Sequence, residues 1–83
     1  MLIPVTTPET LGAIARAERK RQGLRQDDLA ATIGASHLFL RDVERGKSGV
    51  GLGRVMEVLT ELGIRVYLDV PEAAGTSDES TRP

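Results

Sequence analysis

The sequence has no cysteine and only one histidine, His37. Without cysteine the chain can form neither a disulfide framework nor a thiolate metal site, and a single histidine cannot build a conventional zinc site alone. We therefore expect no metal site and no cofactor. The absence of cysteine is also compatible with a reducing cytoplasm.

The sequence also lacks a long apolar run. No stretch approaches the roughly 20 residues that a membrane-spanning helix needs, and residues 1–5 are too short and carry no side-chain charge, unlike a signal peptide. We expect a soluble, cytoplasmic protein. Its 83 residues make one domain, near the size at which a single core supplies only a few kcal/mol of stability. Oligomerisation is the supplement open to such a chain.

A surplus of positive charge is missing as well. The formal net charge is −1, which by itself argues weakly against nucleic acid as a partner, because neutralising phosphates requires lysine and arginine. Up to Gly63, however, nine basic residues stand against eight acidic ones, and the acidic surplus comes from residues 71–83. The basic residues form two clusters, which are Arg19, Lys20, Arg21 and Arg25, then Arg41, Arg45 and Lys47. Such clusters can contact phosphate if they share a face, although a charged run is also the ordinary pattern of a solvated helix.

Four glycines, at positions 23, 34, 46 and 63, each follow a helical pattern and predict four helices. The first begins after Thr7, whose hydroxyl can cap it, with Pro8 at its first position. The second covers residues 26–33 and the third residues 37–45. The inward stripe of the first helix consists of Leu11, Ile14, Ala15 and Ala17.

The fourth helix is predicted over residues 52–62. Val58 lies off its apolar stripe, and we expect it to face a partner. The residues that we expect to cover the core are Leu52, Val55, Met56, Leu59 and Leu62.

Between the second and third helices lies the short turn Gly34-Ala35-Ser36, in which Ser36 can cap the helix that follows. Two short helices joined by a glycine-led turn are typical of a helix-turn-helix, whose second helix can enter the DNA major groove. The outward face of that helix mixes donors, an acceptor and an apolar group, as reading base edges requires. Its residues are His37, Leu38, Arg41, Asp42 and Arg45.

After Gly63 the apolar period changes from 3.6 to 2, which indicates a strand over residues 64–70. A lone strand leaves its backbone groups unpaired, and the internal candidate partner, residues 2–5, contains Pro4. We favour pairing with the same strand of a second copy about a two-fold axis, with pairing inside the chain as the alternative. The inward residues at this dimer interface would be Ile64, Val66, Leu68 and Val70.

Over residues 11–63 the chain resembles the lambda-repressor-like, or XRE-type, helix-turn-helix proteins. The matching motifs are GLRQDDLA, the turn Gly34-Ala35-Ser36 and the sequence VERGK at residues 43–47. With the terminal segment LGIRVYLDV the chain is similar to the HipB-like antitoxins, and this resemblance implies an all-α fold of four helices, a C-terminal β-strand shared across a homodimer, and a HipA-like kinase toxin as partner.

The resemblance also implies roles for single residues. Gln26 and Ser36 would hold DNA phosphates, while His37, Leu38, Arg41 and Asp42 would face the bases. Two further DNA-contacting residues follow from position and not from the resemblance: Arg45 is on the outward face of the third helix, and Lys47, just after it, can donate to DNA backbone oxygens. Arg19 and Glu44 would form a structural ion pair. Arg25 departs from the family, because a capping serine or threonine is usual there.

The sequence therefore predicts a sequence-specific DNA-binding transcriptional repressor, and with the resemblance a HipB-like antitoxin that autoregulates its operon. Its DNA partner would be a palindromic operator, and DNA binding would associate it with the nucleoid. The alternative is a helix-turn-helix interaction module that dimerises without binding DNA. We do not expect an enzyme, since neither Asp27-Asp28 nor His37 beside Ser36 offers a catalytic pairing. The expected organisation is an N-terminal arm (residues 1–7), the helix-turn-helix domain (8–63), the dimerising strand (64–70) and a flexible tail (71–83).

Overall fold

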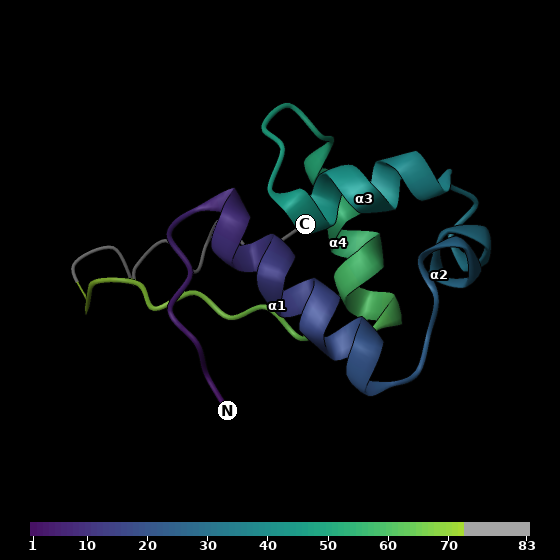
Figure 1. Cartoon of the computed structure of the whole chain (residues 1–83). Coiled ribbons are helices and arrows are strands. Elements are labelled where there is room, and N and C mark those ends of the chain that lie inside the picture. Colours follow the sequence, from purple (N-terminus) through teal and green to yellow (C-terminus); the bar gives the residue numbers. More distant parts are fainter. Residues whose placement is uncertain (73–83) are drawn as a thin grey trace, which may run out of the picture.

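The computed structural model describes residues 1–72 of the chain, and within this range the only regular elements longer than one turn are four α-helices. They are α1 (Pro8–Arg21), α2 (Gln26–Thr32), α3 (His37–Arg45) and α4 (Leu52–Glu61). In Figure 1, α1 lies to the lower left of α4, α3 runs above α4, and α2 lies at the right. The four predicted helices are confirmed, with ends shifted by one residue in α2 and α4.

The start of α1 follows from its first residues. The Thr7 hydroxyl accepts a hydrogen bond from the Thr10 amide at 3.1 Å, and Pro8 occupies the first helical position. Gly46 ends α3 in the left-handed conformation at a φ of 76°. Glycine adopts this conformation without a steric penalty, whereas other residues are strained there.

The core lies where α4 covers the other three helices. It contains Val58, which is fully buried, so the expectation that Val58 faces a partner is wrong. Leu52 is 73% exposed and Met56 is also exposed, and Ala17 of α1 lies outside the core. The buried face of α4 is therefore rotated toward Val58, compared with the predicted face. The sequence alone does not decide between the two faces, because this short helix has apolar residues on both. The core residues are Ala15, Leu29, Ala30, Leu40, Val43, Val55, Val58, Leu59 and Leu62.

No strand is found in the described part of the chain, so the β-strand predicted over residues 64–70 is not present in this single copy. The Ile64 amide donates to the Leu59 carbonyl at 2.9 Å, which closes α4, and the following residues have no ladder hydrogen bonds. The alternative pairing with residues 2–5 is not found among the described residues, and pairing with a second copy stays a prediction. A strand requires a neighbour for its backbone groups, and none is present here. The tail predicted over residues 71–83 lies, after residue 72, outside the described range.

No helix within residues 1–72 is long and apolar enough to cross a membrane.

At Gly12 the backbone of α1 comes close to the backbone of α3. A Cβ atom on Gly12 would lie 2.3 Å from the Val43 carbonyl oxygen and 2.6 Å from that of Glu44. Both are backbone atoms, so relief requires one helix to move away from the other. This position therefore depends on the absence of a side chain.

We expect Gly12→Ala to lower the free energy of unfolding by about 1–3 kcal/mol, because the overpacking outweighs the better helix propensity of alanine. Gly53→Ala is the matched control, since Gly53 also lies in a helix and a Cβ there would meet nothing within 4 Å. It should leave stability unchanged or raise it by up to about 1 kcal/mol. Urea unfolding measures both variants, and a Gly12→Ala protein as stable as Gly53→Ala would contradict the close contact.

Candidate nucleic-acid interface

The turn between α2 and α3 is held by backbone and capping hydrogen bonds. Gly34 has a φ of 67°, and the Ala35 amide donates back to the Ala30 carbonyl at 2.9 Å. At the start of α3 the Ser36 hydroxyl accepts a hydrogen bond from the Phe39 amide at 3.1 Å. Its oxygen caps the helix, and its proton remains able to donate. The turn therefore gives α3 a defined starting direction.

The exposed side of α3 begins with His37 and Leu38, and the leucine side chain is 49% exposed. One and two turns further, Asp42 is half-buried and Arg45 is exposed. Lys47 Nζ lies 3.6 Å from Asp42 Oδ2, so the carboxylate has a cation beside it. Five of the eight predicted DNA-contacting residues lie on α3, and the other three stand at its cap, at the start of α2 and just after α3.

A buried carboxylate connects three helices behind this face. Glu44 of α3 receives two hydrogen bonds from Arg19 of α1, with Nε at 2.6 Å and Nη2 at 3.0 Å. Gln26 of α2 donates its Nε2 to Glu44 Oε1 at 3.0 Å. Both Arg19 and Glu44 are 7% exposed. The bidentate geometry makes this a strong charge-assisted contact.

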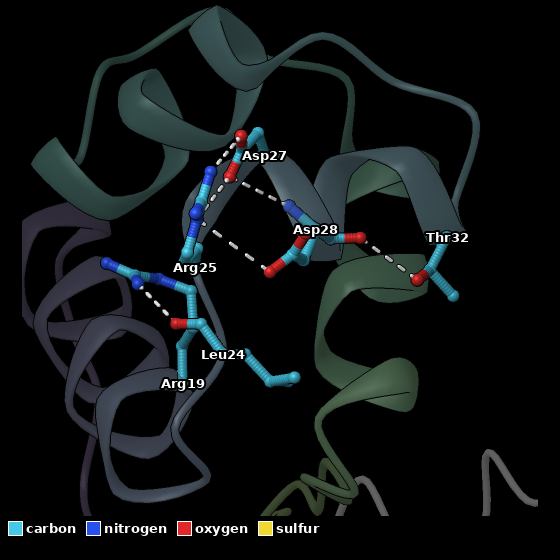
Figure 2. Close-up of polar contacts among 6 residues, drawn as sticks. All are labelled: Arg19, Leu24, Arg25, Asp27, Asp28 and Thr32. Atoms are coloured by element: carbon cyan, nitrogen blue, oxygen red, sulfur yellow. Dashed lines mark hydrogen bonds and ion pairs between the residues drawn. The ribbon is translucent and has the colours of Figure 1, made fainter.

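Arg19 also holds the connection between α1 and α2. Its Nη1 donates to the Leu24 carbonyl at 2.8 Å, as Figure 2 shows. The guanidinium thus uses its remaining nitrogen on backbone outside any helix. One arginine thereby fixes both α3 and the path of the chain into α2.

The pKa of the Glu44 carboxyl is below its ordinary value. Burial opposes ionisation, but the hydrogen bonds from Arg19 and Gln26 and the charges of Arg19 and Arg16 outweigh it. Glu44 is therefore ionised at neutral pH, and its charge is matched inside the protein.

Gln26, which we predicted to hold a DNA phosphate, has part of its hydrogen-bonding capacity used inside the protein. One of its amide protons is used on Glu44, and the side chain is half-buried. A second amide proton and the carbonyl oxygen remain available. Gln26 can thus contact a ligand while its orientation is held from within.

The hydrogen-bonded group of Arg19, Gln26 and Glu44 is the Glu44 tie. Beside it the surface has a shallow depression of about 260 Å³, the hollow. Three arginines surround it against one carboxylate, and Arg19 already neutralises that carboxylate. Arg41 Nε is buried here, and no atom of the described residues accepts a hydrogen bond from it. An anion would satisfy this donor set. The lining residues are Arg16, Gln26, Arg41, Glu44 and Arg45.

Arg16 was missed at the sequence level. It stands three residues before Arg19 on α1, a spacing that places both on neighbouring turns of one helix face. That spacing would have indicated Arg16, but nothing in it shows that α3 brings Arg41 to the same place.

The start of α2 has no side-chain cap, since Arg25 occupies that position. Its Nη2 lies 2.9 Å from Asp27 Oδ2, and Asp27 Oδ1 accepts the Asp28 amide at 3.1 Å (Figure 2). The hydrogen bond from Arg25 holds the pKa of Asp27 below its ordinary value. An aspartate inside the first turn thus compensates for the absent serine or threonine.

The four residues predicted at a dimer interface lie after α4. Ile64 is half-buried against the core, while the other three are exposed, and Leu68 is 82% exposed. A shallow groove of about 390 Å³ runs between α4 and this segment. Its lining includes Met56, Leu59 and Val66.

No family model matches the chain. The chain is 40% identical to the uncharacterized HTH-type transcriptional regulator y4mF of Sinorhizobium fredii over 67 residues, which are 81% of this chain and 88% of that protein. Its fold is similar to two solved structures at 20% sequence identity. A HipB-O4 20mer complex has a TM-score of 0.76, and a HipA-HipB-O2-O3 complex has a TM-score of 0.77. Each alignment covers 86% of this chain and 100% of the HipB-like chain compared.

We expect Glu44→Gln to lower the free energy of unfolding at pH 7 by on the order of 3 kcal/mol, because it leaves Arg19 buried without a carboxylate. The folded pKa of Glu44 is depressed, so its contribution is present above the unfolded value near 4.5 and is lost as the pH falls through the folded pKa. The difference between wild type and variant should therefore shrink below about pH 4.

Urea unfolding between pH 7 and pH 2.5 measures this difference. Glu61→Gln is the control, because Glu61 is exposed and has no ion pair within the described residues. It should match wild type at every pH. A Glu44→Gln deficit that stays constant down to pH 2.5 would show that the charge of Glu44 is not what stabilises the fold.

Proposed function

The chain belongs to the helix-turn-helix-type transcriptional regulators, and on that premise we propose that it is a sequence-specific repressor acting as a HipB-like antitoxin that autoregulates its operon. The observation that carries the proposal is the exposed face of α3, held rigidly by the Glu44 tie and flanked by a hollow rich in arginine. A rigid helix with a polar outer face and basic surroundings is what major-groove recognition requires.

We divide the predicted contacts by their place in the structure. His37, Leu38 and Asp42 would face base edges, because they stand on the outward side of α3. Lys47 beside Asp42 would hold the carboxylate in place or turn to a phosphate. Phosphate contact would fall to the residues around the hollow and to the cap, which are Arg16, Gln26, Ser36, Arg41 and Arg45.

This division moves Arg41 from base reading to the DNA backbone. Arg41 lines the hollow, and its Nε is buried with no acceptor among the described residues, whereas a base-reading arginine presents its guanidinium edge outward into the groove. A phosphodiester oxygen in the hollow would pair with the charged guanidinium. DNA bound in this way would place the protein at the nucleoid.

The proposed homodimer uses residues 64–70. Their apolar side chains alternate, and their backbone after Ile64 has no hydrogen-bond partner among residues 1–72. A second copy would supply ladder hydrogen bonds and cover the groove beside α4. The two recognition helices would then reach half-sites about 34 Å apart, or a multiple of that distance, on a palindromic operator.

The proposed protein partner is a HipA-like kinase toxin. A HipB-fold protein is found together with HipA in the HipA-HipB-O2-O3 complex, which this fold resembles. The binding surface for such a partner would lie away from α3, so that DNA and toxin are bound together.

Two observations favour a second candidate, an interaction module that dimerises without DNA. Leu38 is a large exposed apolar residue on the face where polar base contacts are expected, and the chain has a net negative charge. This candidate predicts no retention on DNA resin at low salt and co-purification with a protein partner. The repressor predicts retention that high salt abolishes.

We expect Arg41→Ala to weaken binding to operator and to random DNA by the same factor and to reduce the salt slope of log Kd by about 1, since one phosphate contact is lost. Fluorescence anisotropy at several salt concentrations measures both. Arg21→Ala is the charge-matched control, because Arg21 pairs with Glu18 at the far end of α1. A loss confined to the operator, with an unchanged slope, would return Arg41 to base reading.

We expect Leu68→Asp to shift the protein from dimer to monomer in sedimentation equilibrium while its helical circular dichroism is retained. A charge at the centre of the shared strand would be desolvated by the partner chain. Leu38→Asp introduces the same charge at an exposed leucine of α3, outside the proposed strand, and should remain dimeric. A dimeric Leu68→Asp protein would refute the strand as the interface.

A further inference from the structure

Arg54 of α4 reaches across to the helix-turn-helix from outside it. Its Nη1 donates to the Ile33 carbonyl and its Nη2 to the Gly34 carbonyl, both at 3.1 Å. Nη1 also lies 2.7 Å from Glu57 Oε1, one turn further along α4. The planar guanidinium is the only common side chain that can make such a forked contact while carrying a positive charge.

The two carbonyls lie at the end of α2, where the helix leaves backbone acceptors unpaired. A cation is favoured at this end of a helix. The last turn of α2 has no basic residue of its own. Arg54 supplies from another helix the charge that α2 lacks.

The same guanidinium also contacts α3. Its central carbon lies 5.8 Å from the centre of the Phe39 ring, within the range of a cation–π contact. Phe39 is half-buried in the first turn of α3, and its amide is the one capped by Ser36. One side chain therefore contacts the end of α2, the turn and the beginning of α3.

We propose that Arg54 is a positioning residue that sets the tilt of α3 relative to α2, and through that tilt the specificity of base contact. This rests on the proposed DNA-binding function. Leu38 immediately precedes Phe39, so a rotation of α3 about the turn would displace the side chains offered to the bases. Phosphate contacts from long flexible arginines tolerate such a shift, whereas base contacts do not.

The test uses Arg54→Lys, which keeps the charge and removes the fork. Glu57→Gln is the matched control, since it removes the neighbouring ion pair and leaves both carbonyl contacts in place. The DNA probes are a duplex selected by wild-type protein from a random pool and a random duplex of equal length. Thermal unfolding of each variant establishes that it is folded under the binding conditions.

We expect Arg54→Lys to lower the ratio of selected to random affinity about tenfold, the size of one well-placed base contact. Its affinity for random DNA and its salt slope should equal those of wild type, and Glu57→Gln should keep the full ratio. An unchanged ratio in Arg54→Lys would overturn the proposal. So would a loss in Arg54→Lys that is equal on both duplexes, because that would make residue 54 a phosphate contact.

A second measurement needs no DNA. Residual dipolar couplings of the backbone amides report the angle between α2 and α3 in the free protein, and this angle should change in Arg54→Lys but not in Glu57→Gln. An unchanged angle in Arg54→Lys would overturn the positioning role. If wild-type protein selects no sequence at all from the random pool, the proposed function is wrong, and so is the proposed effect of Arg54 on specificity. The dipolar couplings would still decide whether Arg54 sets the angle between α2 and α3.

Discussion

Glu44 is a charged carboxylate almost wholly inside the protein, and such a group is stable only with partners close at hand. Arg19 and Gln26 supply them from the two other helices of the site. Any arrangement of α1, α2 and α3 that separates these groups would leave a buried charge unpaired. The tie therefore favours one arrangement of the three helices, and the face that α3 presents depends on it.

The structure divides the work between two sides of α3. Its inner side carries Leu40 and Val43 into the core, while α4 closes that core and also sends Arg54 back to the turn. On its outer side His37 and Arg45 are exposed and can reach a ligand, while Asp42 has Lys47 beside it. The hollow has both kinds of residue in its lining. It contains three arginines proposed to contact phosphate, and it contains Glu44, the carboxylate that holds the helices together.

The segment after Gly63 shows why a pattern can indicate a structure that one chain does not form. Alternating apolar residues describe which faces a strand would have, but a strand exists only when its backbone groups have a neighbour. Within the described chain that neighbour is absent, and the segment leaves its apolar side chains exposed. The proposed second copy accounts for both features at once.

Local chemistry in the sequence determined the four helices, because caps, glycines and apolar spacing act within a few residues of where they stand. The sequence also indicated that His37 and Leu38 lie on the outward side of α3. Contacts between distant residues were decided only by the tertiary structure, among them the rotation of α4 that buries Val58 and exposes Leu52. The same holds for the hollow that joins Arg16 to Arg41 and for the reach of Arg54 to the turn. Spacing along one helix defines a face, but the angle at which helices cross decides what that face meets.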